Sequence, residues 1–593
     1  MFPPPPGIEG RPSVSRRNHA LAFAGLLIAT GLAVVTPADA AHGDWVERTL
    51  RAMTLEEKVG QLFVADVWGK DANQPDPGNQ TKYGVPTAAQ VVERYHPGGV
   101  IYFNNSGTDN VDDPAQVARL SDGLQRAALA SGARLPLIVS TDQEGGRVTR
   151  IAAPATEYPS SMAIGAGRSA EDARELAAIN GRELRAMGIN QDFAPDADVN
   201  SNPLNPIIGS RSFSADPALA SSLVAAEVDG YQNSGPATET VSSAAKHFPG
   251  HGDAATDSHT GLPVIDRTEG QWRQIDLPPF QAAIKAGTDV IMTAHITVPS
   301  LDPSGEPATL SKPIITGILR DELHYDGVVV TDSLQMAGVR QLHPDAEIPV
   351  LALEAGVDQM LMPPDLGVAV TGVLDAVKSG RLTEQRIDQS VRRILALKQK
   401  RGILAQPFTG TPVVGTPEHL ARIQAITDRT TTVLRNDAKL LPLADPGKVL
   451  VTGWNNPAYP GYPAEPVAAL AKDLNGTAAS TGASPTAAQI DEAVAAAKGA
   501  DTVVVLTNGL RTSQPQRDLV RALTNTGKRL IAVSVQEPYD PGYADVPTWV
   551  VTYDWRDVTM RSLAKVLLGR ISPQGKLPVT IPGAYEFGTG LTW

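Results

Sequence analysis

The 593-residue chain contains no cysteine, and this absence excludes several kinds of chemistry. Disulfide bonds, thiolate metal sites, a cysteine nucleophile and a lipidated N-terminal cysteine are all ruled out. Basic residues are too few for a general nucleic-acid-binding surface, because 51 Lys and Arg stand against 64 Asp and Glu, a net charge of −13. Catalysis must therefore use Asp, Glu, His, Lys, Ser or Tyr.

Long hydrophobic runs are absent after the first 40 residues, so we expect no membrane-spanning helix there. Before that point, Arg16-Arg17 precedes an uncharged apolar run over 20–35, and the small residues Ala38-Asp39-Ala40 follow. The run of 16 residues is shorter than the roughly 20 that span a bilayer. This pattern is typical of a cleavable export signal, which we predict over 1–40. The arginine pair suggests export by the twin-arginine route. We expect a secreted, soluble mature protein.

The length and composition indicate a folded protein with at least two domains. Hydrophobic residues make up 42% and charged residues 19% of the chain, as in globular proteins. The stretch 406–417 contains three Pro and two Gly and is predicted to be an interdomain linker. We therefore predict one domain over 41–405 and a second over 418–593.

The first domain alternates short apolar runs with longer amphipathic segments. Several runs are rich in Val and Ile and lie beside Gly, Pro or Asp, as buried parallel strands do. Eight such runs interleaved with helices predict a (β/α)8 TIM-like barrel. An open doubly wound sheet is the alternative, but no Gly-rich phosphate loop follows the first run. The runs are 62–65, 99–103, 137–140, 189–193, 243–246, 290–293, 328–331 and 357–361.

The second domain is predicted to be a smaller α/β/α sandwich, with a sheet layered between helices. The segment 418–436 has the pattern of a helix, and 476–488, rich in Ala, Gly, Ser and Thr, is predicted to be a loop. Apolar runs that predict strands are found at 449–452, 502–507 and 530–535, with a fourth candidate at 549–553.

Polar residues follow the carboxyl ends of five barrel strands: Asp142, Asp196, Lys246-His247, His295 and Asp332. In barrels the loops at that face surround one concave mouth, where active sites form. A single Asp there is better explained as a helix cap. The whole ring of carboxylates, imidazoles and a lysine instead favours acid/base chemistry on a polar, neutral substrate.

The segment 246–259 is the richest in chemistry-bearing side chains. His247 and His251 have the spacing of helical zinc ligands, but Pro249-Gly250 would break that helix, so we expect no metal. Asp257 and His259 are two apart, so in extended backbone both side chains point the same way. The carboxylate could then hold one ring nitrogen while the other faces the substrate. Two ordinary exposed loop residues remain the alternative.

These segments make the chain similar to the family 3 glycoside hydrolases, in the branch of β-N-acetylhexosaminidases that act on cell-wall sugars. The resemblance covers about 45–593, and it departs from the family at Ala254, where Thr is usual. The matching motifs are DQEGGRVTR (142–150), NQDFAPDADVNSNPLNPIIGSRSF (190–213), KHFPGHGDAATDSHTGLP (246–263), GVVVTDSLQM (327–336), TTVLRNDAKLLPL (431–443) and GKLPVTIP (575–582).

The resemblance implies a retaining exo-β-N-acetylhexosaminidase that releases N-acetylglucosamine from peptidoglycan fragments or chitooligosaccharides. It implies that Asp332 is the nucleophile, that His259 is the acid/base and that Asp257 orients His259. It also implies that the terminal sugar is bound by Asp142, Arg150, Arg211, Lys246 and His247. No metal or organic cofactor is implied, and we expect a monomer. An imidazole in place of the usual second carboxyl group adds no negative charge opposite the nucleophile.

Three alternatives stay open. A β-glucosidase or β-xylosidase would share the fold, although those relatives usually lack the Asp257/His259 loop. A phosphorylase is the second alternative, because an imidazole acid/base would not repel an incoming phosphate. The third is a non-catalytic cell-wall-binding protein that uses the barrel as a carbohydrate-binding surface.

Overall fold

The computed structural model describes residues 37–593, with side chains from residue 45 on. The predicted signal lies outside the described residues, apart from 37–40 at the start of α1 (Pro37–Ala52). The chain divides into the units 1–45 and 46–593, and the following description concerns the second. Within the described part, no helix combines the length and the apolar character needed to cross a bilayer.

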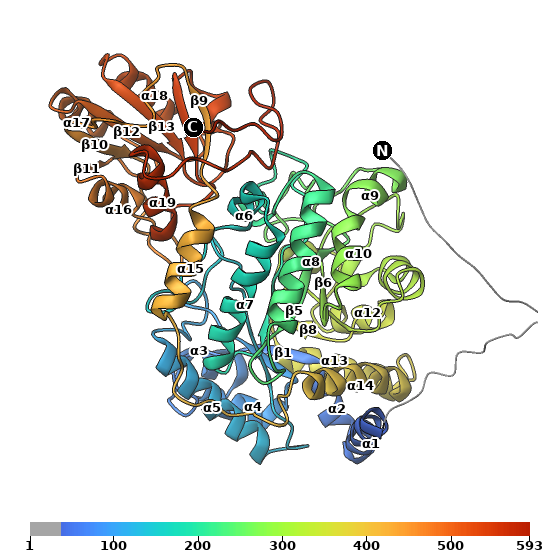
Figure 1. The fold of residues 1–593 in the computed structure, drawn as a ribbon. Helices are drawn as coiled ribbons and strands as arrows, with labels where there is room; N and C mark the ends of the chain where they lie inside the picture. The colour runs from blue at the N-terminus through green and yellow to red at the C-terminus, as the bar shows by residue number, and fades with distance from the viewer. Residues whose placement is uncertain (1–36) are drawn as a thin grey trace, which may run out of the picture. The chain divides into compact units, whose positions relative to one another are not determined.

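Eight parallel strands of the described chain form the first sheet, which closes into a barrel (Figure 1). Their order is β7-β6-β5-β4-β3-β2-β1-β8. The ring closes through a parallel bridge between Val330 and Gln359, where the Thr331 N–H donates to the Gln359 carbonyl at 3.0 Å. The predicted barrel and its eight strands are confirmed. The strands are β1 (Phe63–Asp66), β2 (Gly99–Ile101), β3 (Ile138–Thr141), β4 (Gln191–Asp192), β5 (Ser242–Phe248), β6 (Val290–Thr293), β7 (Val328–Val330) and β8 (Met360–Leu361).

Helices surround the barrel, and side-chain caps define where many of them begin. Asp113 accepts from the N–H groups of Ala115 and Gln116 and is followed by Pro114, a combination that favours a helix start. The helices are α2 (Leu55–Gln61), α3 (Pro77–Tyr83), α4 (Ala88–Tyr95), α5 (Pro114–Ala130), α6 (Ser161–Gly167), α7 (Ala170–Ala186), α8 (Pro217–Asn233), α9 (Glu269–Ile275), α10 (Leu277–Lys285), the π-helix Pro313–Glu322, α11 (Ala337–Arg340), α12 (Ile348–Ala355), α13 (Leu366–Lys378) and α14 (Glu384–Lys400).

A six-stranded sheet forms the second domain within the described residues, in the order β11-β10-β12-β13-β14-β9. Alternate residues of β12 (Thr502–Thr507) enter two different cores: Val503 and Val505 face one, Val504 and Leu506 the other. Helices α17 and α18 cover the first core, and α16 and α19 the second, so the predicted sandwich is confirmed. The other elements are α15 (Pro417–Thr427), β9 (Thr432–Asn436), β10 (Val449–Gly453), α16 (Pro466–Asp473), β11 (Thr477–Ser480), α17 (Ala487–Lys498), α18 (Gln514–Thr524), β13 (Arg529–Ser534), β14 (Thr548–Val551) and α19 (Asp557–Leu567).

Two predictions for the second domain are wrong. Residues 432–436 were expected to continue a helix, but α15 ends at Thr427 and the segment forms β9, antiparallel to β14. The run of Thr and Val at 430–433 disfavours helix and suits a strand. The expected loop at 476–488 contains β11, whose small residues pair with β10 at the sheet edge. Neither pairing can be recognised from local sequence.

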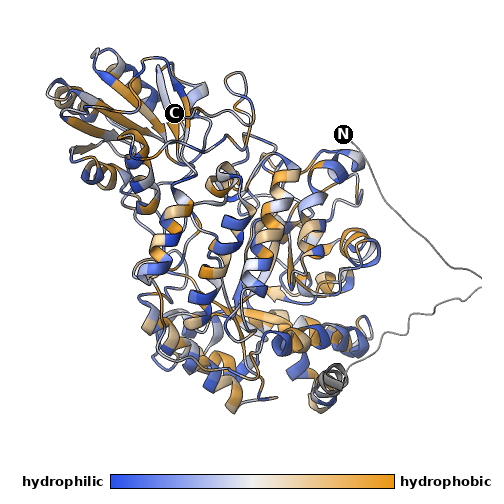
Figure 2. Ribbon diagram, viewed as in Figure 1, coloured by the Kyte–Doolittle hydropathy of each residue, from blue (hydrophilic) through white to orange (hydrophobic). Residues whose placement is uncertain are grey.

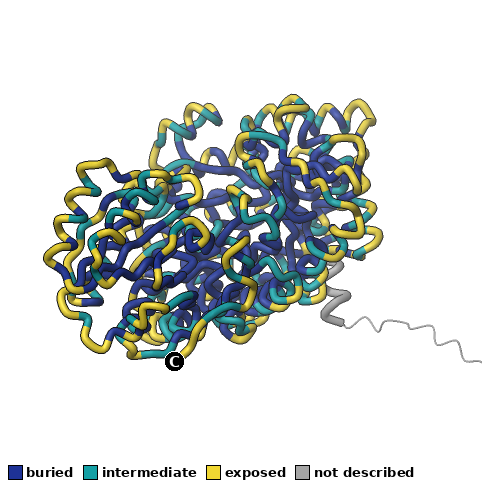
Figure 3. The backbone as a smooth tube through the Cα atoms, turned by 90° about the horizontal axis from the view of Figure 1, so that it is seen from above, coloured by how far each residue is buried: buried dark blue, intermediate teal, exposed yellow. Residues whose placement is uncertain are grey.

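Burial follows the hydropathy of the chain. Apolar residues concentrate on the strands and on the inner faces of the helices (Figure 2). Figure 3 shows buried backbone through the interior and exposed backbone at loops and outer helix turns. No helix or strand is assigned over 405–416, and the domain boundary at 406–417 stays a prediction.

Candidate active site

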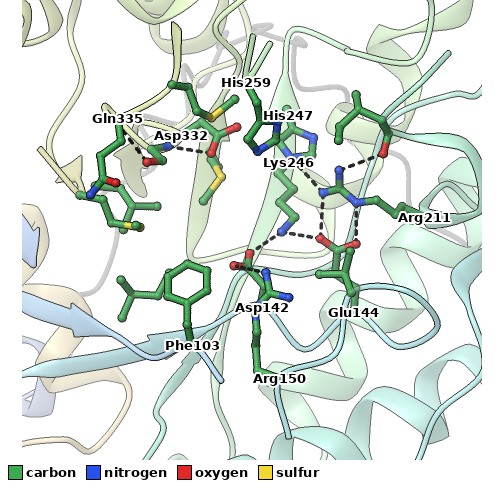
Figure 4. A pocket seen from close by; sticks show the side chains of 18 of the residues that line it. Phe103, Asp142, Glu144, Arg150, Arg211, Lys246, His247, His259, Asp332 and Gln335 are labelled. Carbon is green, nitrogen blue, oxygen red and sulfur yellow. Dashed lines mark hydrogen bonds and ion pairs between the residues drawn. The ribbon is translucent and has the colours of Figure 1, made fainter. Parts of the chain in front are cut away.

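A cavity of about 420 Å³ opens at the carboxyl ends of the barrel strands (Figure 4). Seven of the eight predicted site residues line it, and Asp257 reaches it through a hydrogen bond to His259. Its volume lies in the range of small-molecule sites. The seven residues are Asp142, Arg150, Arg211, Lys246, His247, His259 and Asp332.

A buried network of charges forms one side of the cavity. Lys246 Nζ lies 2.8 Å from Asp142 Oδ1 and 2.6 Å from Glu144 Oε1 (Figure 4). Arg211 donates to both oxygens of Glu144, each at 2.9 Å. Burial favours neutral forms, but the opposite charges outweigh it: the pKa of Lys246 is held above its ordinary range and the pKa of Glu144 below. Lys246 and Glu144 are therefore both charged at neutral pH.

Glu144 was not among the predicted site residues, although it links Lys246 to Arg211. The available signal was its place in the motif at 142–150, two residues after Asp142. Its partners lie about 67 and 102 positions along the chain, so only the closed barrel brings them together.

His247 is held as a neutral imidazole. Its Nδ1 lies 2.7 Å from Asp198 Oδ2, and its Nε2 lies 3.3 Å from Arg211. Because the guanidinium can only donate, Nε2 accepts and Nδ1–H donates to Asp198. Burial first, and the Arg211 charge second, lower the pKa of His247 to about 4. Asp198 is a second group that the sequence analysis missed, although it follows the strand-end Asp196 by two residues.

Asp332 follows β7 and faces the same cavity. Its Oδ1 accepts from the Ser333 N–H at 2.7 Å. Burial raises the pKa of Asp332, but the imidazoles of His247 and His295 outweigh that effect and bring it below its ordinary value. His295 is fixed in turn by Thr309 Oγ1 at 2.8 Å and the Ser333 carbonyl at 3.0 Å. Asp332 is thus an ionised, oriented carboxylate.

Asp257 and His259 lie in the loop after β5 and form the expected pair. His259 Nδ1 is 2.7 Å from Asp257 Oδ1, which also accepts from the His259 N–H at 2.9 Å. The sequence analysis expected extended backbone here, but the chain turns instead. The Gly261 N–H donates to the Asp257 carbonyl at 3.0 Å. The Gly338 N–H bonds the Ser258 carbonyl at 3.0 Å, which ties this loop to α11, just after Asp332.

One group of three side chains among the described residues has a spacing compatible with a metal ion: Asp196, Asp198 and His247. The His247 nitrogens are already engaged by Asp198 and Arg211. An Arg211 nitrogen also lies 3.8 Å from Asp196 Oδ2, so a guanidinium supplies the positive charge there. His251, the other half of the zinc spacing, bonds Ser258 Oγ at 2.9 Å. The expected absence of a metal stays a prediction.

The second domain contacts the loop that carries Asp142 and Glu144. Arg556 donates through Nε to the Gly146 carbonyl at 2.9 Å, and its guanidinium lies 3.7 Å from the centre of the Tyr462 ring. Arg556 is buried, so this contact excludes solvent. The second domain therefore helps to position the loop.

Comparisons with known proteins agree with this geometry. The family model described as "Glycosyl hydrolase family 3 N terminal domain" matches residues 54–397, and "Glycosyl hydrolase family 3 C-terminal domain" matches 431–588. The chain is 36% identical to "Beta-hexosaminidase A" of Pseudoalteromonas piscicida over 67% of this chain and 70% of that protein. It is 30% identical to "Beta-N-acetylglucosaminidase/beta-glucosidase" of Cellulomonas fimi over 67% and 68%. The solved family 3 β-N-acetylglucosaminidase from Paenibacillus sp. str. FPU-7 superposes with a TM-score of 0.81 and 36% identity, covering 89% of this chain and 99% of that one.

Proposed function

This chain belongs to glycosyl hydrolase family 3 and is a glycoside hydrolase, and we propose that it is a retaining exo-β-N-acetylhexosaminidase. The observation that carries the proposal is the Asp257–His259 pair on the loop after β5, whose His259 lines one cavity with the ionised Asp332. The names of the relatives support N-acetylglucosamine as the sugar. Peptidoglycan fragments or chitooligosaccharides are the proposed substrates.

In the first step, the Asp332 carboxylate attacks the anomeric carbon and forms a covalent glycosyl ester. The bond from that carbon to the leaving oxygen breaks, and His259 Nε2–H protonates the leaving oxygen. Asp257 supports this role because its carboxylate bonds Nδ1 and so fixes the orientation of the ring. The leaving group departs as a neutral alcohol.

In the second step, His259 accepts a proton from water, which attacks the same anomeric carbon and releases Asp332. Two displacements at one carbon give net retention. The low pKa of Asp332 suits both steps, because the group must be ionised to attack and must then leave as a carboxylate.

The buried charges are proposed to hold the terminal sugar. Asp142 and Arg150 offer an acceptor and donors, and Lys246 has a donor beyond its two carboxylate partners. Because the charges neutralise one another before substrate arrives, little reorganisation is needed on binding. Arg211 and His247 extend this surface, and Phe103 adds an apolar wall.

The test is Asp332→Ala, assayed with a chromogenic N-acetyl-β-glucosaminide. The side chain makes one hydrogen bond, to its neighbour Ser333, so we expect turnover to fall by at least about 10³-fold while the protein still folds. Asp326→Ala is the matched control, because that side chain precedes the same strand and is 98% exposed. Near-normal hydrolysis by Asp332→Ala would sink the assignment.

Three further measurements address the alternatives. The matching β-glucoside should be hydrolysed more slowly than the N-acetyl substrate; a preference for the glucoside would favour the β-glucosidase alternative. Turnover should not depend on phosphate. An increase in turnover with phosphate would indicate phosphorolysis. An inactive wild type that binds chitooligosaccharides would instead favour a non-catalytic role.

We also propose that the protein acts outside the cytoplasm after removal of residues 1–40. The basic start, the apolar run and the small residues at 38–40 support this. Expression in the native host and N-terminal sequencing of the external protein should give a start near residue 41. Retention of the intact N-terminus in the cytoplasm would contradict export.

A further inference from the structure

A second cavity, of about 720 Å³, lies at the amino ends of the barrel strands. Gly188 and Asn190, just before β4, line it together with Thr238, which precedes β5, and the segment 406–419. None of its lining residues lines the candidate active site. In barrels the amino-end face is remote from the catalytic mouth, so a ligand bound here would not be the substrate.

Arg185, on α7, lines this cavity, and its charge has no partner among the described residues. Arg185 is 8% exposed. Both terminal nitrogens of its guanidinium are shielded from solvent, and neither has a hydrogen-bond acceptor among the described residues. Burial and the neighbouring Arg401 lower the pKa of Arg185 to about 10. Arg401, by contrast, is paired with Asp289. A buried guanidinium without an anion is unfavourable, and the cavity that Arg185 lines is the space from which an anion could approach it.

The segment that covers the cavity is fastened at both ends. The Thr409 N–H donates to Asp122 Oδ1 at 2.8 Å, and the Gly415 N–H donates to Glu183 Oε1 at 2.9 Å. Between them this segment presents apolar groups, including Val413, which is 66% exposed. Phe408, before the first anchor, is 40% exposed. A ligand with an apolar part would cover side chains that now face solvent.

The formal charges around the cavity favour a single negative charge on the ligand. Arg182 and Arg185 are three positions apart on α7, and neither has a carboxylate within 4 Å among the described residues. Glu239 and Glu418 also line the cavity, but both are exposed. These glutamates oppose a dianion, whereas a monoanion would neutralise the buried charge of Arg185. His419 is already held by Glu183 at 2.7 Å.

We propose that this cavity is a second ligand site, which binds a small organic monocarboxylate through Arg185 and covers its apolar part with Phe408 and Val413. The forked guanidinium matches a carboxylate with two parallel hydrogen bonds. The volume accommodates a ligand of several rings or a short acyl chain. The proposal is independent of the sugar specificity proposed above.

Calorimetric titration of the full chain with benzoate tests the site. Benzoate should bind saturably, and at least about tenfold more tightly than benzamide, which has the same ring without the charge. Benzoate should also bind more tightly than acetate, which has the charge without the ring. Equal binding of benzamide or acetate, or no binding of benzoate, would overturn the proposal. Tighter binding of inorganic phosphate than of benzoate would also overturn it, in favour of a phosphate site.

Arg185→Met keeps the apolar stem and removes the charge. It should weaken benzoate at least about tenfold, while its melting temperature without benzoate should equal or exceed that of the wild type. The matched control Arg119→Met removes an exposed charge from α5 and should leave binding unchanged. Asp332→Ala should also bind benzoate normally. Loss of binding in Asp332→Ala, or unchanged binding in Arg185→Met, would refute the site.

Discussion

The hydrogen bond between Asp257 and His259 permits a quantitative test of the proposed mechanism. Asp257→Asn keeps the shape of the side chain and removes its negative charge. In the wild type, Asp257 Oδ1 accepts from both Nδ1 and the backbone N–H of His259, at 2.7 and 2.9 Å. Hydrogen bonds to a charged group are worth about 1.5–3 kcal/mol. The side chain of Asp257 is 31% exposed, which favours the lower part of that range, about 1.5–2 kcal/mol.

That free energy predicts the size of the kinetic effect. At 1.36 kcal/mol per tenfold, kcat/KM should fall about 10–30-fold for chitobiose, whose leaving oxygen must be protonated. For the 4-nitrophenyl N-acetyl-β-glucosaminide the loss should be less than about threefold, because that leaving group departs as a stable anion. Using kcat/KM restricts the comparison to free enzyme and the first step.

A second histidine–carboxylate pair supplies the control. His343 Nε2 lies 2.8 Å from Glu306 Oε2, with side chains 22% and 34% exposed, and neither residue lines the candidate active site. Glu306→Gln should leave kcat/KM unchanged on both substrates. Equal losses for the two substrates in Asp257→Asn would refute the reasoning, since the pair would then not act through leaving-group protonation.

Two further substitutions test the buried network of charges and the contact that the second domain makes with the Gly146 carbonyl. Glu144→Gln should destabilise the protein by about 3–5 kcal/mol in urea unfolding, whereas the partly exposed Glu175→Gln should cost at most about 1 kcal/mol; equal effects would contradict the network. The pKa of Glu144 is held below its ordinary 4.5, so its contribution is complete above that pH and is lost as pH falls through the folded-state pKa. Arg556→Gln removes the donor to the Gly146 carbonyl and should raise KM more than it lowers kcat. The exposed control Arg521→Gln should change neither constant. A loss confined to kcat in Arg556→Gln would argue against a positioning role.

The barrel was predictable because its signals are local. Each strand is buried along its whole length, so it appears in the sequence as a short apolar run. The β9 and β11 strands of the second domain lack that signal. Residues 477–480 are mostly exposed and contain only Thr, Ala and Ser, and they become a strand because β10 offers an unpaired edge.

The candidate site also contains residues that the sequence identified and residues that it missed. Asp332, His259 and Lys246 lie in contiguous motifs at strand ends, so the sequence identified them and the resemblance suggested their roles. Glu144 and Asp198 were missed because a carboxylate next to a predicted site residue carries no sign of its partners. Lys246 and His247 lie on β5, and Arg211 lies in a short helix, 209–211, after β4.

By itself, the sequence determined which residue types are available for chemistry and which short segments form the barrel strands. Those properties depend on composition and near neighbours. The tertiary structure decided the charge states: a neutral His247, an ionised Asp332 and an unpaired Arg185. A pKa depends on burial and on charges that arrive from distant parts of the chain. For the same reason, the cavity at the amino ends of the strands has no counterpart in any sequence motif, since a helix, two strand ends and the 406–419 segment form it together.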